Sequence, residues 1–152
     1  INVWAEIVGD MLIGPHMLPS RLRGPSNRQF LRRHLPRLFE DVPLNTRRQM
    51  WFMHDERTRQ ILSHRFPQRH QCDRIWPPHS PDINPCDYFL WGFLKEQVFH
   101  QHPESMAELR ACIMQVCSTI DEDLCRRVVQ NMNVRLEELV RQNGGHIEHV
   151  LR

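Results

Sequence analysis

The feature that most constrains the fold is a proline-rich stretch that runs directly into an apolar helical pattern. It holds four prolines, from Pro77 to Pro85. Each proline fixes its own φ and disfavours helical backbone at the residue before it, so this part is expected to be extended. Beyond Pro85 the apolar residues become dense, which predicts a largely buried helix over about 86–99. Asp87 therefore lies in the first turn of an apolar helix, directly after a rigid loop.

A carboxylate at this position has two interpretations. Aspartate is among the residues that favour the N-cap, where the side chain accepts a backbone N–H of the first turn. A carboxylate directly after a rigid loop is also held in place as a candidate functional group, and the helix N-terminus favours its negative charge. The helical pattern alone leaves both interpretations of Asp87 open.

Local patterns predict the other elements. In chain order, they are a β-hairpin over about 2–18, a helix over about 26–39, a buried strand over about 50–54, and two C-terminal helices over about 105–120 and 122–143. Gly9-Asp10 forms the hairpin turn, and the stretch from Pro15 to Pro19 is expected to end the hairpin. Ser26 is the expected cap of the next helix, and Pro36 is expected to kink it or end it early.

Local signals also predict how the two C-terminal helices begin and end. Ser105 and Glu108 have the spacing of a capping box, and Asp121 or a neighbour begins the last helix. Gly144-Gly145 is expected to end that helix, because glycine adopts the positive φ of a C-cap.

Arginine supplies nearly all the positive charge, since Lys95 is the single lysine. Six arginines lie on the helix over about 26–39 and in the connection that follows it: Arg28, Arg32, Arg33, Arg37, Arg47 and Arg48. The plain interpretation is a solvated helix face, and the sharper one is a surface that contacts the DNA backbone. The formal net charge of +2 is too small to decide between them.

Asp55 is the second carboxylate with a distinctive position. It follows the apolar run Trp51-Phe52-Met53 and His54, where the buried strand is expected to end. In α/β folds the carboxyl ends of strands are where functional groups gather. Asp55 is therefore a candidate functional residue, whereas Asp10 at the hairpin tip is assigned to turn chemistry.

The string Trp-Pro-Pro-His-Ser-Pro-Asp-Ile-Asn-Pro-Cys-Asp-Tyr-Phe-Leu-Trp-Gly over 76–92 closely resembles the catalytic motif of mariner-type DNA transposases, especially their insect branch. The resemblance implies that Asp87 is the third carboxylate of a metal-binding DDE/D triad and that Asp82 shapes the loop. The run that ends in Asp55 resembles the strand carrying the second carboxylate. The C-terminal tail from Gly144 also resembles the close of these proteins.

This resemblance implies an α/β fold of the ribonuclease-H-like type: a mixed sheet with flanking helices and a helical C-terminal part. It also implies Mg²⁺ or Mn²⁺ bound by Asp55 and Asp87, because these hard cations prefer carboxylate oxygens. The family cleaves DNA strands and transfers them. DNA and a second copy of the chain are the expected partners, the nucleus is the expected location, and no apolar run long enough to span a membrane is evident.

The chain also departs from the family pattern. Glu56 stands where the family has a small residue, and the histidine that usually follows is absent. The strand that carries the first catalytic carboxylate is missing from this sequence, so the expected fold is incomplete. Neither Glu6, within a hairpin strand, nor Asp10, at its tip, fits that role.

Three interpretations of function follow. The first is a fragment or decayed copy of a transposase catalytic domain, expected to be inactive as given and marginally stable. The second is a domesticated nucleic-acid-binding or interaction module without catalysis, and the third is a relic without a role. Whether the chain is an enzyme stays open at this stage.

Overall fold

The computed structural model describes residues 1–50, 81–147 and 149. The chain divides into two units, one made of residues 1–3 and 17–78 and the other of residues 4–16 and 79–152. Of the expected strand over about 50–54, only its first residue is described, and Asp55 lies outside the described residues. No helix among the described residues is both long enough and apolar enough to cross a membrane.

The chain begins with an antiparallel hairpin made of β1 (Asn2–Val8) and β2 (Met11–Leu18). Gly9 takes a φ of +62° in its turn, which the sequence pattern anticipates. Pro15 lies inside β2, and the hairpin ends at Leu18, within the stretch from Pro15 to Pro19 where its end is expected. A proline is tolerated there because, within the described residues, this sheet has two strands, and each keeps an edge that needs no donor.

In the first unit a helical run extends through α1 (Gly24–Gln29), a π-helical turn (Phe30–His34) and α2 (Leu35–Leu38). Ser26 lies inside this run, so the expectation that it caps the helix is wrong. The helix begins earlier because Pro25, which has no N–H to satisfy, occupies its first turn.

Pro36 lies within α2 and directly follows the π-helical turn. The proline ring removes one hydrogen bond and crowds the carbonyl four residues before it, and a widened turn relieves that conflict. The helix then ends at Leu38, two residues beyond the proline.

The buried side chains of the first unit come from this helical run and the turn after it. Among the described residues they are Phe30, Leu31, Leu35, Phe39 and Val42. A further short helix, α3 (Leu44–Gln49), follows Pro43 and carries Arg47 and Arg48 in its last turn.

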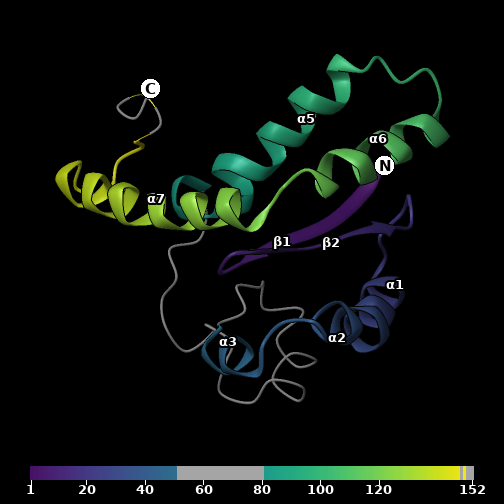
Figure 1. The fold of residues 1–152 in the computed structure, drawn as a ribbon, viewed down its shortest axis with the longest axis horizontal. Helices are drawn as coiled ribbons and strands as arrows, with labels where there is room; N and C mark the ends of the chain where they lie inside the picture. The colour runs from purple at the N-terminus through teal and green to yellow at the C-terminus, as the bar shows by residue number, and fades with distance from the viewer. Residues whose placement is uncertain (51–80, 148, 150–152) are drawn as a thin grey trace. The chain divides into compact units, whose positions relative to one another are not determined.

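The second unit holds the longer helices. Its elements after the hairpin are η3 (Pro81–Ile83), the π-helical turn η4 (Cys86–Leu90), α5 (Trp91–His100), α6 (Met106–Ser118) and α7 (Glu122–Arg141). Helices α5 and α6 lie side by side, and α7 packs against η3 (Figure 1). Leu90, Leu94 and Val98 are buried along one side of the η4–α5 helix.

The ends of α6 and α7 follow the sequence signals. The Ser105 hydroxyl accepts the N–H of Glu108 at 3.1 Å, and the Asp121 carboxylate caps α7 at 2.8 Å. Glu108 reaches back to the N–H of Glu104 rather than to that of Ser105, which completes a variant of the capping box. Gly144 takes a φ of +84° after α7, as expected of a glycine at a helix C-terminus.

Candidate functional site

A single asparagine shapes the loop that presents Asp87. The Asn84 Oδ1 atom accepts the N–H of Cys86 at 3.1 Å, and the Asn84 carbonyl accepts the N–H groups of Asp87 and Tyr88 at 2.9 and 3.0 Å. The 3₁₀ turn before it closes when the Asn84 N–H donates to the Pro81 carbonyl at 3.2 Å. Backbone and side chain of Asn84 therefore fix how the helix starts.

The Asp87 side chain is exposed, and its Oδ2 atom accepts a hydrogen bond from the Asn84 Nδ2 atom at 2.8 Å. No side chain caps the π-helical turn at its N-cap position, so the interpretation of Asp87 as a cap is wrong. Asn84 instead satisfies the nearest backbone donor and orients the carboxylate. The result is an exposed acidic group held in one direction at the start of a buried helix.

Helix α7 holds this loop in place through one buried arginine. The Arg135 guanidinium lies over the Tyr88 ring, 4.0 Å from its centroid, and donates to the Asp82 carbonyl at 3.0 Å. The Tyr88 hydroxyl donates to the Val128 carbonyl at 2.7 Å. Only 7% of Arg135 is exposed, so these contacts form away from bulk water, where they are stronger.

Asp82, the other aspartate of the motif, contacts the C-terminal tail. Its Oδ2 atom lies 3.4 Å from the Ile147 N–H and 3.4 Å from the His146 Nδ1 atom. Ile147 is fully buried, so the tail is anchored by an apolar side chain as well as by polar contacts. Asp82 therefore links the motif loop to the C-terminal tail, and its role in shaping the loop stays a prediction.

Glu6 is the residue near this site that sequence reasoning did not assign to it. The Cys86 thiol lies 3.4 Å from the Glu6 Oε1 atom and 3.8 Å from the Ala5 carbonyl oxygen. These contacts bring β1 to the start of η4. The signal in the sequence is a carboxylate among the apolar residues of Val-Trp-Ala-Glu-Ile-Val, where an acidic group is rarely left without a partner.

Glu6 and Cys86 lie near Asp87, and the pKa of each is raised, which favours the neutral form. Burial raises the pKa of Glu6, and the negative charge of Asp87 raises it further, against the lowering effect of hydrogen bonds from Cys86 and the Ile7 backbone. Burial, and the charges of Glu6 and Asp87, raise the pKa of the Cys86 thiol. The Glu6 and Asp87 carboxylates thus lie within electrostatic reach of each other.

The donor atoms favour a hard cation over a soft one. Asp87 offers carboxylate oxygens at an exposed position, which suits Mg²⁺ or Mn²⁺. Burial and nearby negative charge raise the pKa of the Cys86 thiol, which disfavours the thiolate that a soft metal requires. No group of three or more histidine, cysteine, aspartate or glutamate side chains within residues 1–50 and 81–147 is arranged to hold a metal ion.

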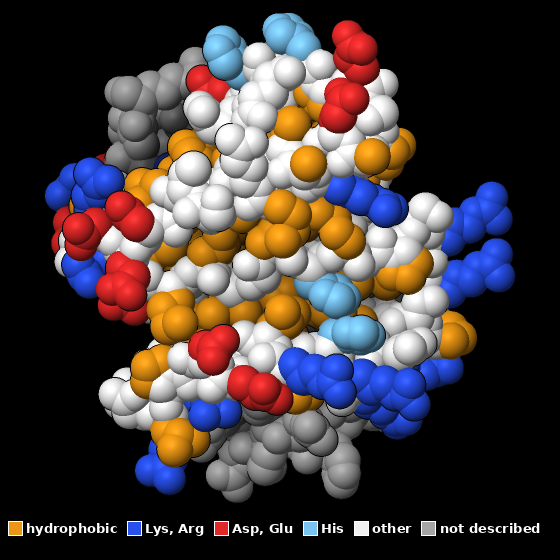
Figure 2. Space-filling view, turned by 45° about the vertical axis from the view of Figure 1, so that its right-hand side comes forward, with side chains coloured by type: hydrophobic (Ala, Val, Ile, Leu, Met, Phe, Trp, Pro, Cys, Tyr) orange, Lys and Arg blue, Asp and Glu red, His pale blue; other side chains and the backbone are white. Residues whose placement is uncertain are grey.

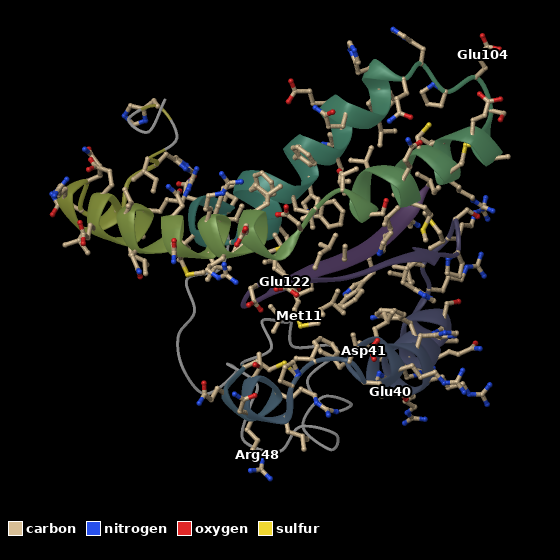
Figure 3. The ribbon with its side chains drawn as sticks, in the orientation of Figure 1. Met11, Glu40, Asp41, Arg48, Glu104 and Glu122 are labelled. Atoms are coloured by element: carbon tan, nitrogen blue, oxygen red, sulfur yellow. The ribbon has the colours of Figure 1, made fainter. Side chains whose placement is uncertain are left out.

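The candidate nucleic-acid-binding arginines all fall in the described part of the first unit. Arg28, Arg32, Arg33 and Arg37 are exposed along the α1–α2 run. Figure 2 shows Lys and Arg side chains projecting from the face that it displays. Arg48 is exposed and points away from α3 (Figure 3), whereas Arg47 is half-buried and therefore less accessible to a partner.

The chain is similar in sequence to a curated transposase. The Transposable element Tc3 transposase of Caenorhabditis elegans is 33% identical over 76 residues, which amount to 49% of this chain and 23% of that transposase. The match thus spans less than a quarter of the relative. No protein-family model matches the chain. The similarity supports a relationship to transposases of the Tc1/mariner group and fits a transposase-derived chain.

Proposed function

We propose that this chain derives from the catalytic domain of a mariner-type DDE/D transposase of the insect branch, with a ribonuclease-H-like fold. The observation that carries the proposal is the presentation of Asp87. Its carboxylate is exposed, oriented by Asn84, and set in a loop that Arg135 fastens to α7. The similarity to the Tc3 transposase supports the same origin.

In this proposal Asp87 and Asp55 are the two carboxylates that hold Mg²⁺ or Mn²⁺. When bound there, such an ion would supply activation of an attacking oxygen and stabilisation of the leaving oxygen in the cleavage of a DNA phosphodiester. The role of Asn84 is to fix the direction of the Asp87 carboxylate before the ion arrives, since it donates to Oδ2 at 2.8 Å. Asp82 and Arg135 act through the loop rather than on the metal.

The chain as given is expected to be inactive. The family uses three carboxylates, and only the second and the third have counterparts in this sequence, at Asp55 and Asp87. The test is incubation of the purified 152-residue protein with supercoiled plasmid and MgCl₂ or MnCl₂. The expected result is no nicking above that of the Asp87→Ala variant. Metal-dependent nicking that the Asp87→Ala change abolishes would contradict the expected inactivity.

DNA in the nucleus is the proposed setting, and a second copy of the chain is a proposed partner. Light scattering of the purified chain at several concentrations measures its molar mass and so distinguishes a monomer from a dimer. A mass that stays at one copy over the whole range argues against the dimer.

An alternative function is a nucleic-acid-binding module in which catalysis has been lost. The observation that favours it is the row of exposed arginines on α1 and α2. Salt-sensitive binding to duplex DNA without nicking supports this alternative. A chain that neither binds nor nicks DNA at low salt is left with the third interpretation, a relic without a role.

A further inference from the structure

Three of the exposed arginines surround a hollow on the first unit. The hollow has a volume of about 330 Å³ and is lined by Pro25, Arg28, Gln29, Arg32 and Arg33. Pro25, the pair Arg28-Gln29 and the pair Arg32-Arg33 recur at intervals of three to four residues, the spacing that places side chains on one side of a helix. The hollow therefore follows a single stripe of the helical run.

The opposite side of the same run is apolar and buried, which fixes the direction in which the arginines point. Phe30, Leu31 and Leu35 are each at most 4% exposed. Because these side chains are held in the interior, the helix cannot turn to hide its arginines. Figure 3 shows nitrogen-tipped side chains pointing outward from α1 and α2.

The charge of this surface is not balanced locally. The sequence has no acidic residue between Asp10 and Glu40, and within the described residues no carboxylate forms an ion pair with Arg28, Arg32 or Arg33. Arg28 and Arg32 are four residues apart on a helix, a spacing at which like charges repel. An anion seated between them would relieve that repulsion.

The chemistry and spacing of the three arginines fit a phosphate backbone. A guanidinium binds a phosphate through two parallel hydrogen bonds. Arg28 precedes Arg32 and Arg33 by about one helical turn, so the three guanidinium groups form a row on one side of the helical run. A row of cations suits the phosphates of one strand, which recur about every 3.4 Å along the duplex axis.

A membrane surface fits this part of the chain less well. Helices that bind at a bilayer surface insert an apolar face beside their basic one. Here the apolar face is occupied in the interior, and the side chains between the arginines include the polar Gln29. We infer that the hollow lined by Arg28, Arg32 and Arg33 seats the phosphate backbone of double-stranded DNA, independently of base sequence.

This inference rests on the proposed DNA partner and adds the surface that binds it. The test is fluorescence anisotropy of a labelled 20-base-pair duplex of arbitrary sequence, titrated with the full chain at several salt concentrations. The test variant carries Arg28→Gln, Arg32→Gln and Arg33→Gln. The control variant removes the same charge at exposed basic residues outside the hollow and outside the candidate arginines: Lys95→Gln, Arg110→Gln and Arg127→Gln. Circular dichroism checks that both variants keep their helices.

The hollow variant is expected to lower the slope of log K against log salt by about 2 to 3, which corresponds to three lost phosphate contacts. The control variant is expected to change that slope by less than about 1. Equal losses in the two variants, or no loss in either, would overturn the inference while leaving the DNA partner in place. No duplex binding by the unmodified chain at low salt would overturn the inference and the DNA partner together.

Two further probes test the competing ligands. Vesicles of phosphatidylcholine and phosphatidylserine report on membrane binding, and polyglutamate reports on recognition of acidic peptides. The inference requires that the duplex binds more tightly than either probe at the same salt concentration. Tighter binding of vesicles or polyglutamate, lost in the hollow variant, would reassign the hollow to that ligand. The plasmid-nicking result has no bearing on these outcomes.

Discussion

Replacing Arg135 tests whether α7 holds the motif loop in place. The Arg135→Met variant keeps most of the aliphatic stem but removes the guanidinium that lies over Tyr88 and donates to the Asp82 carbonyl. A hydrogen bond from a charged donor contributes about 1.5–3 kcal/mol, and a cation–π contact about 0.5–2 kcal/mol. Since neighbouring contacts do not add fully, we expect the free energy of unfolding to fall by about 2–4 kcal/mol.

The assay is urea unfolding followed by circular dichroism, and the expected fall lowers the urea midpoint by about 1–2 M. The matched control is Arg127→Met, an exposed arginine of the same helix, which should change stability by less than about 0.5 kcal/mol. Arg135→Lys serves as a milder variant if Arg135→Met does not fold. A midpoint for Arg135→Met equal to that of the control would refute the argument that this arginine fastens the loop.

Three further predictions concern stability. Burial and the charge of Asp87 raise the pKa of Glu6 above 4.5. The folded chain therefore binds the proton of the Glu6 carboxyl group more tightly than the unfolded chain does, and the free energy of unfolding should fall as pH rises from about 4.5 through the raised pKa. Glu6→Gln should flatten this fall and raise the urea midpoint at pH 7 in metal-free buffer; an unchanged pH profile would contradict the assigned cause. Gly14→Ala should destabilise the hairpin by about 1–3 kcal/mol, because Gly14 has a φ of +96° and an added Cβ would lie 2.9 Å from the Trp4 carbonyl oxygen; a melting temperature equal to that of the unmodified chain would exclude this strain. Asp121→Ala should cost about 1 kcal/mol by removing the cap of α7, and Asp121→Asn, which can still accept the N–H, should recover most of the loss in the same urea assay.

The elements that sequence analysis placed correctly depend on local signals. Helices α6 and α7 begin at side-chain caps and have apolar residues at helical spacing, so neighbouring residues specify them. The hairpin turn at Gly9 and the C-terminal cap at Gly144 are specified in the same way by glycine. Sequence analysis was wrong where two local signals competed, as at Ser26, where Pro25 set an earlier helix start.

Contacts between distant residues lie beyond local patterns. Glu6 and Cys86 meet across 80 positions of sequence, and Asp82 and Ile147 across 65. Periodicity carries no information about such pairs, because they depend on how strands and helices pack. The motif identifies Asp87 in the sequence. The hydrogen bond by which Asn84 orients the Asp87 carboxylate is seen only in the structure. The assignment of Asp55 stays a prediction.

The central claim is that Asp87 is a metal-binding carboxylate. Its most direct test is Mn²⁺ binding to the full chain, measured by the electron paramagnetic resonance signal of free Mn²⁺. The variant is Asp87→Asn, and the control is Glu96→Gln, which neutralises an exposed acidic residue on α5. We predict that Asp87→Asn weakens Mn²⁺ binding by about tenfold or more, the scale expected when a metal site is disrupted, while the control leaves it unchanged. Equal affinity in Asp87→Asn and Glu96→Gln would contradict the claim.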